Sequence, residues 1–230
     1  MNSRLTKLGM VIAIFGLAFV AAGGYAFMKV QEGERSLNAL SAAQNVRLSY
    51  NAEGVLVDRG EPAGAQAIMS LLVNDWAYPV QASEMNPNDP VVNTASEYMY
   101  QMATVTYHTL NSTQTVVLAE DVTAADGTVY PAGTYEFPVD GRYWAAFNRA
   151  NPIEAKAREQ AWTGTAHALI AELGVGTTTA STLQMGLGLA ALFGGVGFMF
   201  FLSGIGLVWA ARPETAKVKV PVLRPAINPA

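Results

Sequence analysis

Apolar residues concentrate in two stretches near the ends of the chain. Residues 8–28 contain no charged side chain, and neither do residues 185–211. At a rise of about 1.5 Å per residue, each stretch is long enough as a helix to cross a hydrocarbon core about 30 Å thick. The pattern therefore predicts a membrane protein with two transmembrane helices, one over 8–28 and one over 185–211.

Between the two stretches, helical and strand periodicities alternate, which predicts an α+β domain over residues 29–184. The first helix should continue beyond the membrane through residues 29–44. Two short strands are expected on either side of a turn at 51–54. Pro62 then marks the first turn of a helix, where a proline loses no hydrogen bond.

Two later helices share a start signal. Asp89-Pro90 and Asn151-Pro152 each combine a capping side chain with a proline suited to the first helical position. We expect helices over residues 90–110 and 152–173. An internal duplication is one explanation of this echo, and shared helix-start chemistry is the other.

The segment between these helices, residues 113–139, has the alternation and the Val, Thr and Tyr content of strands. Turn residues occur at Asp126-Gly127 and again at Pro131–Gly133. The segment therefore predicts antiparallel hairpins.

Charge sets the expected orientation. Residues 1–7 carry two bases and residues 212–230 carry four, whereas the segment between the spans holds eight bases and 17 of the 18 acids. Because basic residues stay on the cytoplasmic side, both termini should be cytoplasmic and the acidic domain should lie outside the plasma membrane. The acidic charge argues against a nucleic-acid partner. The chain has no cysteine, so no disulfide stabilises the domain.

Both terminal segments need an interpretation of their own. A secretory signal peptide would share the basic residues Arg4 and Lys7, but its apolar region is usually shorter than this one, which favours a retained anchor. The proline-rich tail at 212–230 should be disordered unless a neighbouring protein holds it.

Part of the chain resembles a known group of proteins. The residues that carry the resemblance are Ala65–Ile68, Asn88–Pro90 and Thr94–Ser96, followed by the glycine-rich last span. They are similar to those of small actinobacterial membrane proteins with two spans and one exported loop. Such proteins are often labelled aromatic ring-opening dioxygenases, but the ligand set of a non-haem iron enzyme is missing from this sequence. The resemblance implies an anchored exported domain and no known activity.

The two histidines are the candidate metal ligands. His108 and His167 both occupy the frame T-x-H-x-L, and neutral imidazole binds copper or zinc. Glu172, Met99 and Met102 are not spaced to share a helix face with them. The alternative is that each histidine is an ordinary hydrogen-bonded helix residue, and we expect no metal or other cofactor.

Motifs of catalysis are missing from the sequence. There is no nucleophile elbow, no H-E-x-x-H and no phosphate-binding loop. Acidic pairs such as Glu120-Asp121 and Asp58/Glu61 fall at predicted turns, where solvated carboxylates are ordinary. We expect that the chain alone is not an enzyme.

Small residues recur every seven positions in both spans. The first span carries Gly9, Gly16 and Gly23, and the second carries Ala190, Gly197 and Gly204. Such stripes let helix backbones approach closely in lipid. We expect them to be helix-packing faces for neighbouring helices. The spans contain no Asp, Glu, Lys, Arg or His, which argues against an ion path.

The expected function is that of a non-catalytic accessory subunit of a larger integral-membrane complex, whose partners are other membrane subunits and the lipid bilayer. Aromatic residues of the domain are candidate anchors for such contacts. A respiratory assembly or a copper-type monooxygenase is considered by association alone. The alternatives are an exported metal-binding or metal-delivery protein and a membrane-tethered enzyme.

Overall fold

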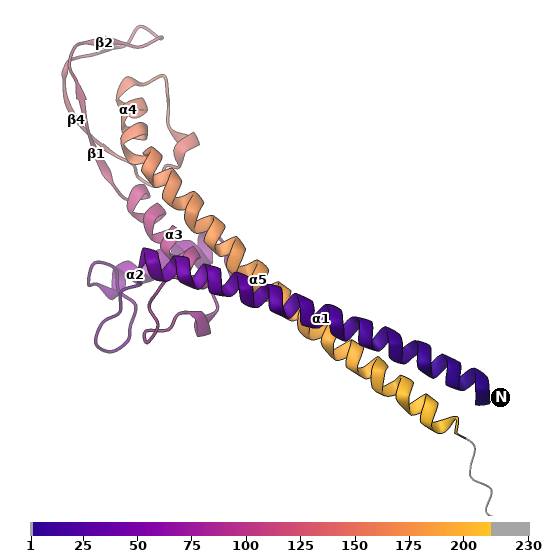
Figure 1. Ribbon diagram of the computed structural model, residues 1–230. Coiled ribbons are helices and arrows are strands. Elements are labelled where there is room, and N and C mark those ends of the chain that lie inside the picture. The colour runs from indigo at the N-terminus through magenta and orange to yellow at the C-terminus, as the bar shows by residue number, and fades with distance from the viewer. Residues whose placement is uncertain (1, 213–230) are drawn as a thin grey trace, which may run out of the picture. The chain divides into compact units, whose positions relative to one another are not determined.

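The computed structural model describes residues 2–212, and Figure 1 shows the arrangement of its helices and strands. Met1 and residues 213–230, which hold most of the proline-rich tail, lie outside the described residues. In chain order the elements are α1 (Asn2–Gln44), α2 (Pro62–Ser70), a π-helical turn (Leu71–Asp75), a 3-10 turn (Ala82–Glu84), α3 (Ala95–Leu110), β1 (Thr113–Leu118), β2 (Val122–Thr123), β3 (Val129–Tyr130), β4 (Gly133–Pro138), a second 3-10 turn (Trp144–Ala146), α4 (Pro152–Ala161) and α5 (Gly164–Ala210).

The chain divides into two compact units. Among the described residues, the first consists of residues 2–28 and 187–212, and the second consists of residues 29–186. By length and composition, α1 and α5 are each able to cross a membrane. Only 11% of the most apolar window of either helix is buried, unlike the core helix of a globular domain. An α+β region lies between these two helices, as predicted.

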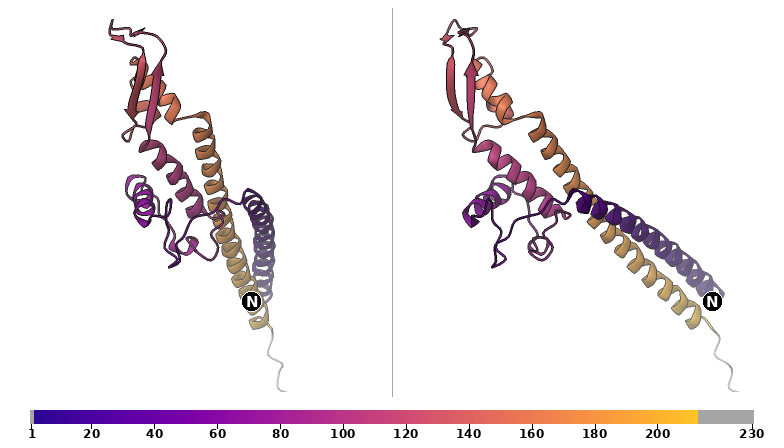
Figure 2. Two further views of the ribbon diagram at one scale, coloured as in Figure 1. Left: turned by 90° about the vertical axis from the view of Figure 1, so that its left-hand side faces the viewer. Right: turned by 60° about the vertical axis from the view of Figure 1, so that its left-hand side comes forward.

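In the first unit, the helices α1 and α5 lie side by side and antiparallel (Figures 1 and 2). The buried positions among its described residues are all small. They are Gly9, Gly16, Gly23, Ala190, Gly197, Gly204 and Ala211. The apolar side chains outside this line are largely exposed, which suits a lipid surface.

In the second unit, the main core is built from α2, the π-helical turn and α3. Ile68, Leu72 and Ala103 are fully buried there, with Tyr98 and Tyr100 beside them. Proline occupies the start of α2 as predicted, and the helix widens into the π-helical turn after Ser70.

A long hairpin extends the second unit. β1 pairs antiparallel with β4 from Thr113↔Pro138 to Leu118↔Gly133, and β2 pairs with β3 toward the tip. Val116 and Leu118 alternate with exposed residues and pack on Ala157 of α4, which covers one face of the ribbon (Figure 2). The strands predicted from the alternation of residues 113–139 are therefore confirmed.

The expected start of α3 at Asp89-Pro90 is wrong. The helix begins at Ala95, where Thr94 and Glu97 form a capping box. Pro90 lies outside any helix, and its carbonyl accepts a hydrogen bond from the Leu48 amide. The reciprocal side-chain bonds of the box satisfy two free amide groups, which a proline signal alone does not. The proposed echo between the Asp89-Pro90 and Asn151-Pro152 helices therefore differs at its first turn.

The helix that starts at Asn151-Pro152 is shorter than expected. α4 ends at Ala161, because Trp162 leaves the helical conformation and its indole donates to the Arg142 carbonyl. The Thr163 hydroxyl accepts from the Ala166 amide at the start of the new helix α5. His167 thus belongs to α5 rather than to the helix of Pro152.

The polar, glycine-containing segment 174–182 continues α5 without a break. Thr177, Thr178 and Thr182 each donate their hydroxyl to the carbonyl four residues earlier, so their polar groups are satisfied within the helix.

The two strands expected around residues 51–54 are only isolated bridges, although the turn itself is present, with Gly54 at φ +76°.

Candidate functional site

The two histidines occupy different surroundings. The Nε2 atom of His108 lies 3.0 Å from Oδ1 of Asp58, a contact between residues far apart in the sequence. His167 instead packs its ring against Trp144 and Trp162. Each histidine therefore has local partners of its own. Within residues 2–212, no three His, Asp or Glu side chains gather in a group that would hold a metal ion.

The glycine stripes of the first unit face one another. A Cβ added to Gly16 would lie 2.6 Å from the carbonyl oxygen of Gly197, and one added to Gly9 would lie 2.7 Å from that of Gly204. Gly23 faces the carbonyl of Ala190 in the same way, at 2.8 Å. The neighbouring helix of each stripe is thus the other span of the same chain. We call this contact the glycine seam.

Close approach explains why the seam needs small residues. Backbone atoms of one helix occupy the space in which the other would place a Cβ, so even alanine must force the helices apart. Glycines off the seam, such as Gly195 and Gly206, have open space at the same position. The heptad interval keeps the seam on one side of each helix and favours a left-handed crossing.

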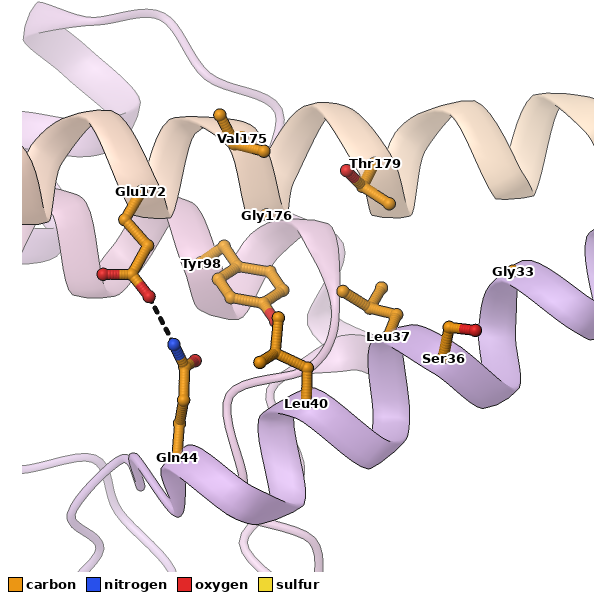
Figure 3. Close-up of a pocket in the computed structure, with 10 residues that line it drawn as sticks. All are labelled: Gly33, Ser36, Leu37, Leu40, Gln44, Tyr98, Glu172, Val175, Gly176 and Thr179. Atoms are coloured by element: carbon orange, nitrogen blue, oxygen red, sulfur yellow. Dashed lines mark hydrogen bonds between the residues drawn. The ribbon is translucent and has the colours of Figure 1, made fainter.

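In the second unit, α1 and α5 border an apolar groove of about 510 Å³ (Figure 3). Tyr98 of α3 reaches between the helices, and its hydroxyl lies 2.8 Å from Oγ of Ser41. The ring occupies the space in which Gly176 would otherwise carry a Cβ. At one end of the groove, Gln44 donates a hydrogen bond to Glu172.

The groove exposes large apolar side chains to the surroundings. Leu40 is 55% exposed and Val175 is 67% exposed, although both line it. The charged residues of this part of α1, such as Glu32 and Arg35, lie outside the lining. An exposed apolar hollow is typical of a surface that binds a protein or a ligand.

Buried carboxylates in the same unit have structural partners. Glu97 is 1% exposed and accepts hydrogen bonds from the amides of Asn93 and Thr94. Burial raises the pKa of this carboxyl above its ordinary value, against the lowering effect of those bonds. Glu84 accepts from the Ser96 amide and from Gln184, and so joins the Ala82–Glu84 turn to α3 and α5. Both acids therefore hold helix ends and segments in place.

A second pocket, of about 490 Å³, is lined mainly by aromatic rings. It gathers Trp76, Tyr143, Trp144, Trp162 and His167, together with Thr106 of α3. We call it the aromatic pocket. Its residues come from four separate parts of the chain, so the sequence shows that aromatic residues are abundant but not where they meet. A weak signal was available, because three of the four tryptophans lie in the domain between the spans.

Comparison with known proteins adds no assignment to these features. Protein-family models, curated proteins and solved structures all give no match to this chain.

Proposed function

We propose that the chain is a membrane-anchored accessory subunit that binds other subunits of an integral-membrane complex and performs no catalysis itself. In this proposal both spans lie in the plasma membrane, both termini are cytoplasmic, and the α+β domain is outside. The observation that carries the proposal is the apolar groove with its exposed Leu40 and Val175.

The position of the groove indicates the kind of partner. Its lining begins at Gly33, five residues beyond the last residue of the uncharged stretch that ends at Met28. At about 1.5 Å per residue, this is less than 10 Å along the helix. A protein that fills the groove therefore lies at the membrane surface, which favours a partner anchored in the same membrane.

The contact between the two glycine stripes also favours the groove as the surface that binds partners. Since the seam is occupied within the chain, partner binding does not depend on it. The outward faces of the spans are apolar and suit lipid or other transmembrane helices. Exposure of the groove to water is unfavourable, because burial of apolar area lowers the free energy.

The test is co-purification of the full-length chain in a mild detergent, with partners identified by mass spectrometry. We expect integral-membrane proteins in stoichiometric amounts with the wild-type chain. The double variant Leu40→Gln, Val175→Gln should lose them, because two buried apolar contacts become polar. Val117→Gln is the matched control, since Val117 is 56% exposed on β1 and lies outside the groove.

Two results would contradict the proposal. The wild-type chain would purify without membrane partners, or the groove variant would keep the same partners as Val117→Gln. Thermal unfolding of each variant shows whether a loss of partners reflects the groove or a damaged fold.

A further inference from the structure

The aromatic pocket is an open groove whose rings contact one another, with Tyr143 and Trp144 44% and 39% exposed. Tyr143 and Trp162 are stacked at a centroid distance of 5.7 Å, and the indole of Trp76 donates to the Tyr143 hydroxyl at 3.0 Å. The Trp162 indole donates to the Arg142 carbonyl at 3.0 Å. His167 meets Trp144 edge to face, at 5.1 Å and 87°. These contacts hold the walls in place before any ligand arrives, which lowers the entropy cost of binding.

One wall presents a hydrogen-bond acceptor. Nδ1 of His167 lies 3.0 Å from the Thr163 carbonyl oxygen. A carbonyl only accepts, so Nδ1 carries the proton, and Nε2 of the neutral ring has the free lone pair. Nε2 makes no hydrogen bond within residues 2–212. It is therefore open to a ligand that donates an N–H or O–H.

A second polar group of the pocket is also open. Thr106 is 2% exposed and lines the cavity. Its neighbours Thr104 and Thr109 on α3 donate their hydroxyls to helix carbonyls, but the Thr106 hydroxyl has no hydrogen bond in the described part of the chain. The hydroxyl oxygen is not one of the fully buried atoms without a partner, so it keeps some accessible surface and can bond to a ligand in the pocket.

The surroundings exclude two common ligands of aromatic pockets. A sugar needs many hydrogen-bond partners, whereas this lining is almost wholly apolar apart from His167 and Thr106. A quaternary ammonium needs free ring faces and a negative field. Here the Arg158 guanidinium already lies 3.8 Å from the Trp144 ring centroid, so a second cation would be repelled.

We propose that the aromatic pocket binds a neutral planar aromatic ligand that carries a hydroxyl group, a phenol in chemical class. The ring packs among the Trp and Tyr side chains, where stacked and edge-to-face contacts are favourable. The hydroxyl donates to Nε2 of His167, and a second polar substituent on the ring bonds to Thr106. The volume of about 490 Å³ lies within the range of small-molecule sites.

The test uses two probes of nearly equal shape, 4-cyanophenol and its methyl ether, 4-methoxybenzonitrile, at a pH at which the phenol is neutral. The full-length chain in lipid nanodiscs carries Trp209→Phe, so that tryptophan fluorescence reports the three pocket indoles alone. Empty nanodiscs correct for partition into lipid. We expect saturable quenching by the phenol and at least about tenfold weaker binding of the ether, which has no hydroxyl to donate.

Variants locate the two polar contacts. Thr106→Val keeps the side-chain shape and should weaken phenol binding several-fold, as should His167→Phe, which keeps a ring beside Trp144. Thr104→Val is the matched control with unchanged affinity, because its hydroxyl is bonded to the Tyr100 carbonyl.

The proposal is overturned if quenching by the phenol does not saturate, or if both probes bind equally well. Unchanged phenol affinity in His167→Phe would also overturn it. The comparison of the two probes needs only the Trp209→Phe chain, so it decides the matter even if a pocket variant does not fold.

Discussion

Two tyrosines on α3, two residues apart, illustrate how much depends on a single hydrogen bond. Tyr98 and Tyr100 are both buried in the same core. The Tyr98 hydroxyl lies 2.8 Å from Oγ of Ser41, whereas the Tyr100 hydroxyl has no partner among the described residues. Burial, with the negative charge of Asp58 as a further cause, raises the pKa of Tyr100. Tyr100 therefore remains un-ionised, with the desolvation cost of a polar group.

The pair gives a matched prediction for stability. Tyr98→Phe should lower the free energy of unfolding by about 1 kcal/mol, because a buried hydrogen bond is lost. Tyr100→Phe should leave it unchanged or raise it by up to about 1 kcal/mol, because no bond is lost and an unpaired hydroxyl is removed. Thermal unfolding of the full-length chain in nanodiscs measures both. Equal destabilisation by the two variants would show that the Tyr100 hydroxyl has a partner in solution.

At the scale of elements, the glycine seam predicts that α1 and α5 tolerate no added side-chain atom where their backbones meet. Gly197→Ala would place a Cβ 2.6 Å from the Val20 amide nitrogen and 2.7 Å from the Gly16 carbonyl oxygen, too close for either to stay in place. Overpacking of this kind typically costs about 1–3 kcal/mol. We therefore expect Gly197→Ala to lower thermal stability and to separate the two helices.

Gly206→Ala is the control for that prediction, since its added Cβ meets open space. It should be neutral or slightly stabilising, because alanine favours a helix over glycine. Spin labels on cysteines at Ile14 and Met199, which are 66% and 65% exposed, report the separation. Because the chain has no other cysteine, labelling is specific. A distance distribution identical for both alanine variants would show that the helices do not pack through Gly197.

The sequence predicts a helix or strand well when the residues that determine it are close together in the chain. The apolar stretches, the Pro62 helix start and the hairpin alternation are local patterns, and the helices and strands follow them. The predicted start of α3 is wrong because two start signals compete within six residues, and the capping box of Thr94 and Glu97 satisfies more backbone donors than Asp89-Pro90 does. The end of α4 depends on a contact between Trp162 and Arg142, twenty residues apart.

The candidate sites are likewise predictable only where nearby residues form them. Heptad spacing singled out the small residues of the spans, since one helix suffices to align them. The aromatic pocket and the His108–Asp58 contact depend instead on tertiary structure, which joins α3 to segments 50 residues away or at the start of α5. No local pattern around His167 indicates that its ring would meet Trp144.

For the whole molecule, the distribution of charge indicates on which side of the membrane the α+β domain lies. The segment between the spans has a formal charge of −9, from 8 bases and 17 acids, whereas the two end segments hold the other six bases. From the bias of Lys and Arg toward the cytoplasm, we propose that the α+β domain, with its groove and aromatic pocket, lies outside. A ligand or partner would reach these surfaces without crossing the membrane.

Labelling of intact cells tests this orientation. Ala125 lies exposed beside the β2–β3 turn, and the chain has no cysteine of its own. Ala125→Cys should therefore react with a membrane-impermeant maleimide on intact cells, while Ser3→Cys, exposed near the N-terminus, should react only after lysis. The six terminal bases make the reverse orientation unfavourable, because they would have to cross the bilayer. If Ser3→Cys reacts on intact cells and Ala125→Cys does not, the domain is cytoplasmic, and the partners of the groove must be sought on that side.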